Sequence, residues 1–339
     1  MFDAVVILGP TASGKSDLSL QLAKRYNCEI ISLDSALIYK GMDIGTAKPS
    51  VEERSICPHH LIDICDPAQS YSAANFREDT MALIEQIKAR KALPVICGGT
   101  MMYYKALVEG LSQVPSSTPQ VRSQVQELAD KHGWPYVHSL LKDIDTVQYE
   151  RLAPNDKQRV ARALEVYYLT GKPMSSFFTS PKEQCPFKLF ELVLLPQDND
   201  RSHLRVMIRK RFEKMLELGF LDEVKQLLER SDLTDDMPSM RSVGYRQAAM
   251  YLRNEVSYEE MIELSVIATA RLAKHQMTWL RGGLKEQSSQ DKIVRHCLAI
   301  EDEHKCERML DLIAAEPSFA AFKKWSNLKK RSIGLACKY

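Results

Sequence analysis

A glycine-rich segment near the start of the chain carries residue types that bind phosphate. The run Gly9-Pro10-Thr11-Ala12-Ser13-Gly14-Lys15-Ser16 fits the pattern G-x-x-x-x-G-K-[ST] at every fixed position. Its glycines let the backbone wrap around a phosphate, and its N–H groups face the anion together with the N-terminus of the next helix. Lys15 would reach the outer phosphate, and the Ser16 hydroxyl would ligate Mg²⁺. The sequence therefore predicts that all eight residues form a phosphate-binding loop.

The loop pattern alone does not identify the phosphate compound. ATP or GTP is the default, and it would make the chain a kinase or NTPase. In that interpretation, Ile30-Ile31-Ser32-Leu33-Asp34 is the strand that ends in a Mg²⁺-binding aspartate. The pattern leaves this alternative open.

The loop needs a strand before it and a helix after it, and the neighbouring sequence predicts both. Helical patterns occupy residues 15–26 and 72–90. Because strands alternate with helices, we predict an α/β fold with a P-loop NTPase-like parallel sheet covered on both faces. Five apolar runs are the expected strands: Val5 to Gly9, Glu29 to Asp34, His60 to Ile64, Leu93 to Gly98, and Phe190 to Leu195.

The strand spacing changes after residue 110. Helical patterns alone fill the interval up to Phe190, and proline-rich stretches flank it at 114–119 and 171–186. We therefore predict an all-helical insertion domain at 116–188. Residues 1–115 and 189–283 would form a discontinuous core domain, and residues 284–339 a helical C-terminal extension.

Composition narrows the class of protein. Hydrophobic residues make up 45% of the 339, the formal net charge is +2, and the eight cysteines form no C-x-x-C pair. No apolar run is long enough to span a membrane, and the N-terminus lacks the basic start of a signal peptide. We therefore expect a cytoplasmic monomer with free thiols. Local basic clusters can still attract a phosphate backbone on a nearly neutral protein.

A longer string beyond the phosphate loop resembles a motif of bacterial tRNA dimethylallyltransferases. It runs Asp34-Ser35-Ala36-Leu37-Ile38-Tyr39-Lys40-Gly41-Met42-Asp43-Ile44-Gly45-Thr46-Ala47-Lys48-Pro49. Five further matches follow in the family's order, so that the resemblance extends from residue 3 to residue 283. They lie at 71–76, 98–104, 155–165, 241–247 and 274–282.

The resemblance implies a reaction and its partners. The enzyme would transfer a dimethylallyl group from dimethylallyl diphosphate to N6 of adenosine 37 in tRNAs that read codons starting with U, with Mg²⁺. The target base would be flipped out of the anticodon loop, where extrusion costs little. A related enzyme that prenylates free AMP or ATP is the rival within the family. The helical insertion and the 241–246 segment argue against it.

The resemblance also assigns roles in the reaction. Asp34 corresponds to the general base that takes the N6 proton. Lys15, the loop N–H groups, Thr100 and Arg211 correspond to the groups that hold the diphosphate. Thr100 would equally serve as a helix N-cap. The chain departs from the pattern at Met207, where relatives often carry an arginine.

Four segments correspond to the family's tRNA contacts, together with Thr100 and with Arg122 in the insertion. A tryptophan at position 279 would stack on a base or pack in the core. The segments are Asp34, Ser35, Ala36 and Leu37; Gln158, Arg159, Val160, Ala161 and Arg162; Arg241, Ser242, Val243, Gly244, Tyr245 and Arg246; and Lys274, His275, Gln276, Met277, Thr278, Trp279, Leu280 and Arg281.

The extension after residue 283 lies outside the matched motifs. Its histidines and cysteines, from His296 to Cys337, do not have the spacing of a zinc finger. Lys323-Lys324, Lys329-Lys330-Arg331 and Lys338 make it basic, which would allow weak contact with tRNA.

Overall fold

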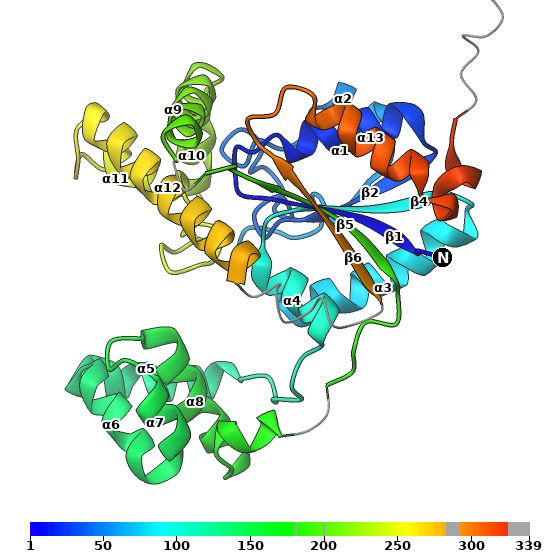
Figure 1. The fold of residues 1–339 in the computed structure, drawn as a ribbon. Helices are drawn as coiled ribbons and strands as arrows, with labels where there is room; N and C mark the ends of the chain where they lie inside the picture. Colours follow the sequence, from blue (N-terminus) through cyan, green and yellow to red (C-terminus); the bar gives the residue numbers. More distant parts are fainter. Residues whose placement is uncertain (180–181, 199–200, 283–291, 325–339) are drawn as a thin grey trace, which may run out of the picture. The chain divides into compact units, whose positions relative to one another are not determined.

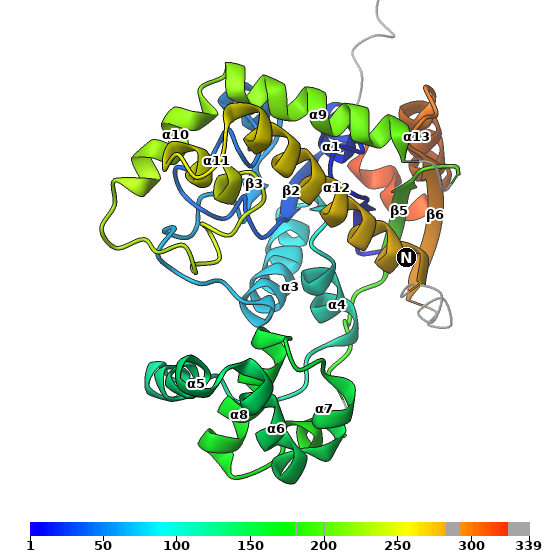
Figure 2. The same ribbon diagram turned by 90° about the vertical axis from the view of Figure 1, so that its left-hand side faces the viewer.

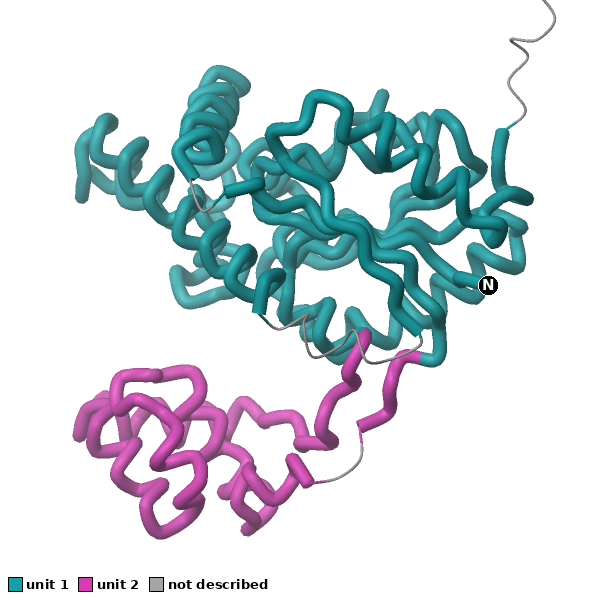
Figure 3. The backbone as a smooth tube through the Cα atoms, in the orientation of Figure 1, with its two compact units in different colours: residues 1–107, 186–339 teal, residues 108–185 magenta. Residues whose placement is uncertain are grey.

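The structure is a computed structural model of the chain and describes residues 1–179, 182–198, 201–282 and 292–324. Two compact units make up the chain (Figure 3). Unit 1 comprises Met1–Leu107 with Pro186–Tyr339, and unit 2 comprises Val108–Cys185. The helical insertion was predicted at 116–188, so the observed division begins eight residues earlier. Lys329, Lys330, Arg331, Cys337 and Lys338 lie outside the described residues.

A six-stranded parallel sheet forms the centre of unit 1 (Figure 1). Its strands lie in the order β3-β2-β4-β1-β5-β6. The first strand to be made, β1, is therefore central, because Val5 is paired with Val95 on one side and with Phe190 on the other. The strands are β1 (Ala4–Leu8), β2 (Cys28–Leu33), β3 (His59–His60), β4 (Leu93–Gly98), β5 (Leu189–Leu195) and β6 (Ile293–Ala299).

Helices cover both faces of the sheet, as predicted for parallel strands buried on both sides. Helices α1 (Lys15–Arg25) and α13 (Lys305–Ala315) lie over one face, and α3 (Ala73–Ala89) and α4 (Met101–Glu109) over the other (Figures 1 and 2). A short helix, α2 (Val51–Ile56), precedes β3. The α/β class with a parallel sheet is confirmed.

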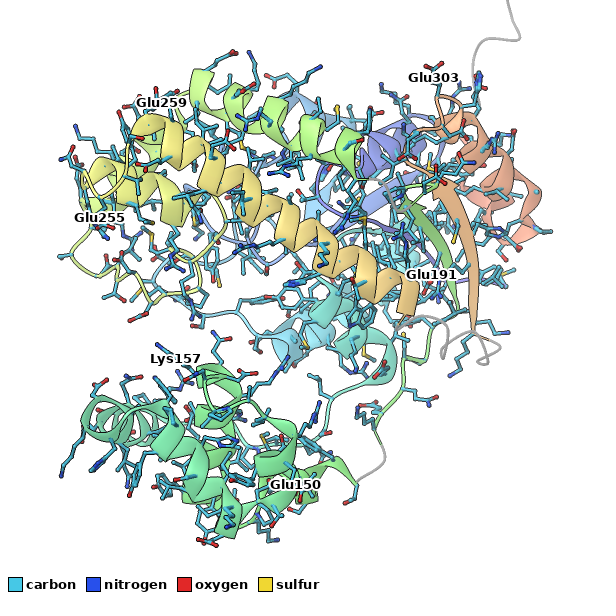
Figure 4. The ribbon with its side chains drawn as sticks, turned by 60° about the vertical axis from the view of Figure 1, so that its left-hand side comes forward. Glu150, Lys157, Glu191, Glu255, Glu259 and Glu303 are labelled. Carbon is cyan, nitrogen blue, oxygen red and sulfur yellow. The ribbon has the colours of Figure 1, made fainter. Side chains whose placement is uncertain are left out.

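Two details of the predicted sheet were wrong. The third strand is only His59–His60, because Leu61 and Asp63 have positive φ angles of 61° and 56° and cannot continue a strand. The expectation of a purely helical extension after residue 283 also fails, since β6 pairs along its whole length with β5. Arg295 interrupts the apolar run of β6 in the sequence. Its charge is accommodated by Glu191 opposite it, which is fully buried (Figure 4).

The C-terminal segment is consequently part of unit 1 rather than an appendage. Met309 and Ile313 of α13 and Phe319 of the 3₁₀ helix η3 (Pro317–Phe322) are buried in the same hydrophobic cluster as Leu18 and Leu22 of α1. The Phe2 N–H donates to Ser318 Oγ at 2.9 Å, which joins the two ends of the described chain.

Four helices stand beyond the edge of the sheet where the strands end: α9 (Ser202–Glu217), α10 (Phe220–Leu228), α11 (Tyr245–Leu252) and α12 (Tyr258–Gly282) (Figure 2). Phe212, Phe220 and Tyr245 pack edge to face in their core. This cluster also buries Ile38, Tyr39 and Met42, so it fixes the segment that follows β2.

Unit 2 is helical and has a core of its own. Its helices are α5 (Pro119–His132), α6 (Trp134–Ile144), α7 (Thr146–Arg151) and α8 (Lys157–Thr170), followed by η1 (Met174–Phe178). Val125, Val137, Leu141 and Leu164 are buried at its centre. Lys157 opens α8 (Figure 4). Within the described ranges of both units, no helix is both long and apolar enough to span a bilayer.

Candidate active site

The phosphate loop connects β1 to α1 as the pattern requires. Gly14 has a left-handed conformation (φ 87°) directly before Lys15, and Ala12 has φ 62°. The Ser13 hydroxyl is buried without a hydrogen-bond partner among the described residues. An unsatisfied buried hydroxyl costs free energy unless a ligand or water supplies a partner. The loop is therefore shaped to receive an anion.

Lys15 lies across this loop. Its Nζ donates to the Pro10 carbonyl at 2.8 Å. Burial lowers the pKa of Lys15 to about 8, while the nearby Cys97 and Asp34 partly oppose this shift and Arg211 adds to it. A bound diphosphate would offer this ammonium the anionic partner that the folded chain does not give it.

Gln276 of α12 connects the phosphate loop to the turn after β4. Its Oε1 accepts the Thr11 N–H at 2.9 Å, and its Nε2 donates to the Gly99 carbonyl at 2.8 Å. Gly99 has no room for a side chain, because a Cβ there would lie 2.7 Å from Gln276 Nε2. Gln276 was predicted as an RNA contact by resemblance. In the structure its amide is engaged in holding the loop.

Asp34 and Thr100 lie at the ends of the neighbouring strands β2 and β4, as parallel strands with a shared register allow. Asp34 Oδ1 accepts the Ala36 N–H at 2.8 Å, and no described residue hydrogen-bonds to Oδ2. Thr100 Oγ1 accepts the Ser35 N–H at 3.0 Å. The threonine hydroxyl thus fixes Ser35, the residue after the aspartate. Asp34 Oδ2 is available to accept a hydrogen bond or a proton from a ligand.

Arg211 projects from α9 toward the same place. Its guanidinium is 3.4 Å from Thr11 Oγ1 and 3.3 Å from the Thr46 carbonyl. Burial lowers the pKa of Arg211 and the Asp34 carboxylate partly offsets this, yet a guanidinium stays protonated at neutral pH. A permanent cation therefore faces the phosphate loop.

Glu223 of α10 holds the segment from Asp43 to Thr46, a role that we did not predict. Its carboxylate accepts the N–H groups of Asp43, Ile44 and Gly45 at 2.8, 2.7 and 3.1 Å. It also accepts the Tyr245 hydroxyl at 2.6 Å. Because this set joins distant parts of the chain, no local pattern could have identified Glu223.

Lys48 secures the same segment from its other end. Its side chain is 2% exposed, and Nζ contacts Asp43, Asp63 and the Tyr39 carbonyl at 2.5, 2.5 and 2.7 Å. A buried ammonium needs such partners to stay charged. The long motif that follows Asp34 is thus largely a scaffold that positions the Thr46 carbonyl beside Arg211.

Several of these groups line one cavity of about 550 Å³ in unit 1, and the others hold the segments that form it. Asp34, Thr100 and Arg211 line it together with Thr11 and Ala12 of the loop. It also has an apolar wall that we did not predict, built from Ile208, Phe212 and Met215 of α9 with Met101 and Leu272. The sequence does carry a signal for this wall. Ile208, Phe212 and Met215 are spaced by four and seven positions, and residues with that spacing share one face of a helix.

Three of the four predicted RNA segments reach this cavity, although not with every residue. Ser35 and Ala36 line it, as do Arg241 to Tyr245 and His275, Gln276 and Trp279. Other members of the segments serve different purposes: Met277 and Leu280 are buried in the core, and the Thr278 hydroxyl donates to the Lys274 carbonyl. Leu37 lines a separate small pocket, and Lys274 lines a different groove. Arg281 donates to the carbonyls of Pro196 and Asp198. Arg246 is exposed away from the cavity.

The remaining predicted RNA contacts belong to unit 2. Gln158 and Arg159 are exposed in the first turn of α8, and Arg159 pairs with Asp156 at 3.1 Å. Arg162 donates to the Pro115 carbonyl at 2.6 Å, so it also holds the connecting segment. Arg122 and Ala161 line one pocket, whereas Val160 is fully buried.

A metal ion would depend on the substrate for most of its ligands. Ser16 is exposed and lines a small pocket of about 90 Å³ beside the loop rather than the large cavity. Among the described residues no group of three acidic, histidine or cysteine side chains is placed to hold a metal. Mg²⁺ commonly binds through one or two protein ligands plus substrate phosphates, and a single hydroxyl at Ser16 fits that mode.

Met207 lies outside the cavity, with its side chain 40% exposed on α9. Among the described residues, the lysine and arginine side chains that line the cavity are Arg211 and Arg241, and Lys15 lies on the adjoining phosphate loop. A methionine at 207 removes none of these cations.

Known families and structures resemble this chain over most of its length. A family model described as IPP transferase matches residues 37–283, and one described as isopentenyl transferase matches residues 2–63. A tRNA isopentenylpyrophosphate transferase from Bacillus halodurans has 34% identity and a TM-score of 0.62, covering 92% of this chain and 95% of that one. A tRNA delta(2)-isopentenylpyrophosphate transferase from Staphylococcus epidermidis has 32% identity and a TM-score of 0.61, with 92% and 97% coverage.

A third similar structure is a eukaryotic dimethylallyltransferase acting on tRNA. It has 28% identity and a TM-score of 0.77, covering 92% of this chain and 77% of that chain. The first family model alone spans well over half of the chain. With the phosphate loop, the strand-end aspartate and the helical unit inserted before β5, these matches show that the chain belongs to the IPP transferase family.

Proposed function

We propose that this enzyme transfers the dimethylallyl group of dimethylallyl diphosphate to N6 of adenosine 37 in tRNA. The observation that carries the proposal is the single cavity at which a phosphate loop, an aspartate and an apolar wall meet. A kinase would need the loop and the aspartate. It would have no use for an apolar wall beside the phosphate site.

The acceptor nitrogen is a weak nucleophile and needs a base. Its lone pair forms a bond to C1 of the dimethylallyl group while the C1–O bond breaks and diphosphate leaves with that electron pair. The N6 proton passes to Asp34, whose Oδ2 is free of hydrogen bonds from described residues. A positioned base of this kind contributes about 10²–10⁴-fold in rate.

The departing diphosphate accumulates negative charge, and the cations of the cavity stabilise it. Lys15 and the loop N–H groups face its outer phosphate, and Arg211 approaches from α9. The Thr100 hydroxyl lies beside Asp34 and would meet the diphosphate near the bond that breaks. Mg²⁺ held at Ser16 would supply further positive charge to the leaving group.

The apolar wall suits the hydrocarbon part of the donor. Ile208 lies three residues before Arg211 on α9 and Phe212 directly after it, so one helix presents both a cation for the diphosphate and apolar groups for the prenyl chain. Excluding water there would also protect a carbon that develops positive charge.

The RNA would be recognised by both units. Segments 241–245 and 275–279 border the cavity that receives the base, and the exposed first turn of α8 would contact the anticodon stem-loop. Phosphate contacts of this kind position a nucleic acid more than they specify it.

The proposal is tested by offering radiolabelled dimethylallyl diphosphate with tRNA, with AMP, or with ATP alone. We expect label in tRNA only, and a loss of label in Asp34→Asn. Label in AMP would identify a free-nucleotide prenyltransferase. ATP hydrolysis that requires Lys15, without prenyl transfer, would identify an NTPase.

A further inference from the structure

A second groove lies along α12, on the flank opposite the reaction cavity. It encloses about 560 Å³ between the first half of α9 and the second half of α12. Arg271 and Lys274 line it, whereas Leu272 and Trp279 line the cavity. At 3.6 residues per turn, Lys274 and Leu272 project to nearly opposite sides of the helix. The two depressions thus lie on opposite flanks of α12, and Ile208 of α9 lines both.

Four cations line this groove, two from each helix. Arg201 and Arg205 on α9 are four residues apart, and Arg271 and Lys274 on α12 are three apart, so each pair shares a face. None of the described residues that line the groove is acidic. Within the described ranges none of the four forms an ion pair, whereas the neighbouring Arg209 pairs with Glu263.

The floor of the groove is apolar and fixed. Leu204, Ala273 and Met277 are each no more than 3% exposed, and they belong to the cluster that joins α9 to α12. Because these residues are part of the core, the four cations are held on a rigid support. Like charges gathered without counter-charges destabilise a fold, so such a cluster indicates an anionic partner.

We propose that this groove binds the phosphodiester backbone of the RNA substrate, next to the nucleotide whose base enters the cavity. The proposal rests on the proposed function. A helix with its side chains is roughly 10–12 Å wide, and an extended single strand spans that distance with a few nucleotides. A strand that places its base in the cavity on one flank of α12 therefore reaches the groove on the other flank after crossing the helix.

The exposed ridge of α12 between the two depressions supports this path. Thr278 is exposed there, and the exposed His275 borders the cavity. Neither side chain is acidic, so neither would repel a phosphate. An acidic protein would match the charges equally well. The RNA is favoured because the cavity that shares this helix already takes an RNA base under the proposed function.

The test compares two double variants that each remove two positive charges. Arg205→Gln with Arg271→Gln alters the groove, and Lys210→Gln with Lys225→Gln alters exposed lysines of α9 and α10 that line neither depression. Binding of an anticodon stem-loop RNA is measured across a salt series. Loss of two contacts to single-stranded RNA should flatten the logarithmic salt slope by about 1.4.

We expect the groove variant to bind RNA at least tenfold more weakly in moderate salt, with an unchanged KM for dimethylallyl diphosphate and an unchanged single-turnover rate at saturating RNA. Arg205→Lys with Arg271→Lys keeps the charges and should restore the slope. A groove variant that matches the lysine control would overturn the proposal. So would a raised diphosphate KM with the RNA slope intact, because the groove would then serve the diphosphate. Prenyl transfer to tRNA by the unaltered enzyme is measured alongside. If the unaltered enzyme transfers the prenyl group, either result overturns only the groove proposal; if it does not, the proposed function itself has failed.

Discussion

Glu223 offers the sharpest test of how the site is held, because one carboxylate accepts four hydrogen bonds. Oε2 accepts from Asp43 and Ile44, and Oε1 accepts from Gly45 and Tyr245. In Glu223→Gln, one oxygen becomes an NH₂ group that cannot accept. The amide can place its NH₂ group at either oxygen position. The position of Oε1 costs less, because the Tyr245 hydroxyl there can rotate and accept a hydrogen bond from the NH₂ group.

The Gly45 N–H then loses its acceptor, and the remaining bonds lose their charge. An unsatisfied buried donor costs about 1–3 kcal/mol, and a bond to a charged group is stronger than a neutral one by about 1 kcal/mol, so the segment should lose about 2–4 kcal/mol of local stability. At about 1.4 kcal/mol per factor of ten, protection from amide exchange should fall by about 30- to 1,000-fold.

The assay is hydrogen–deuterium exchange of peptides covering Asp43 to Thr46, with Asp222→Asn as the control. Asp222 is an exposed acid beside Glu223 with no bond to this segment. We also expect the KM for dimethylallyl diphosphate to rise, because the Thr46 carbonyl positions Arg211. Unchanged exchange in residues 43–46, or equal loosening throughout unit 1, would refute the reasoning.

Three further outcomes are expected. Asp34→Ala should lower the single-turnover rate by about 10²–10⁴-fold while RNA binding stays near its normal affinity, and a normal rate would remove Asp34 from the mechanism. Burial sets the pKa of Lys15 at about 8, and the charged form binds the anion, so kcat/KM for the diphosphate should fall as pH rises through this value. Lys15→Arg should postpone that fall, since guanidinium stays protonated, and an identical profile would assign the titration to another group. Arg159→Ala should raise the KM for tRNA and flatten the salt slope of tRNA binding by about 0.7–0.9 without changing the diphosphate KM. Kinetics across a salt series would show both effects. Arg162→Ala should in addition loosen the chain at Pro115, because the Arg162 guanidinium donates to the Pro115 carbonyl.

The elements that place the site follow from local patterns in the sequence. The phosphate loop, its strand and its helix occupy the predicted positions because G-x-x-x-x-G-K-S fixes a backbone shape within a few residues. Asp34 and Thr100 were expected at strand ends, and parallel register brings them together. Helices α5 to α8 occupy the interval before β5, where the sequence showed helical patterns alone.

Other parts of the site depend on pairings between distant segments. Strand β6 was missed because Arg295 reads as a surface charge until Glu191 lies opposite it. Burial still raises the pKa of Glu191 to about 7 despite this partner. The second role of Gln276 was hidden in the same way, since its partners Thr11 and Gly99 are far from it in the chain. Sequence patterns indicate periodicity and local backbone conformation. They do not indicate which side chain accepts a hydrogen bond from an N–H group far away in the chain.

The central position of β1 bears on the order in which this chain acquires its structure. Strand β1 is made first, yet one of its two neighbours, β5, begins only at Leu189, after all of unit 2 has been synthesised. Contacts of such long sequence separation form slowly, because a large loop must close before they stabilise anything. Unit 2 has its own core within Val108–Cys185, so on the ribosome it can fold while β1 is paired with β4 alone. An apolar strand left with an open edge is prone to misassembly. The inserted helices thus lengthen the interval during which a nascent chain would benefit from chaperone protection.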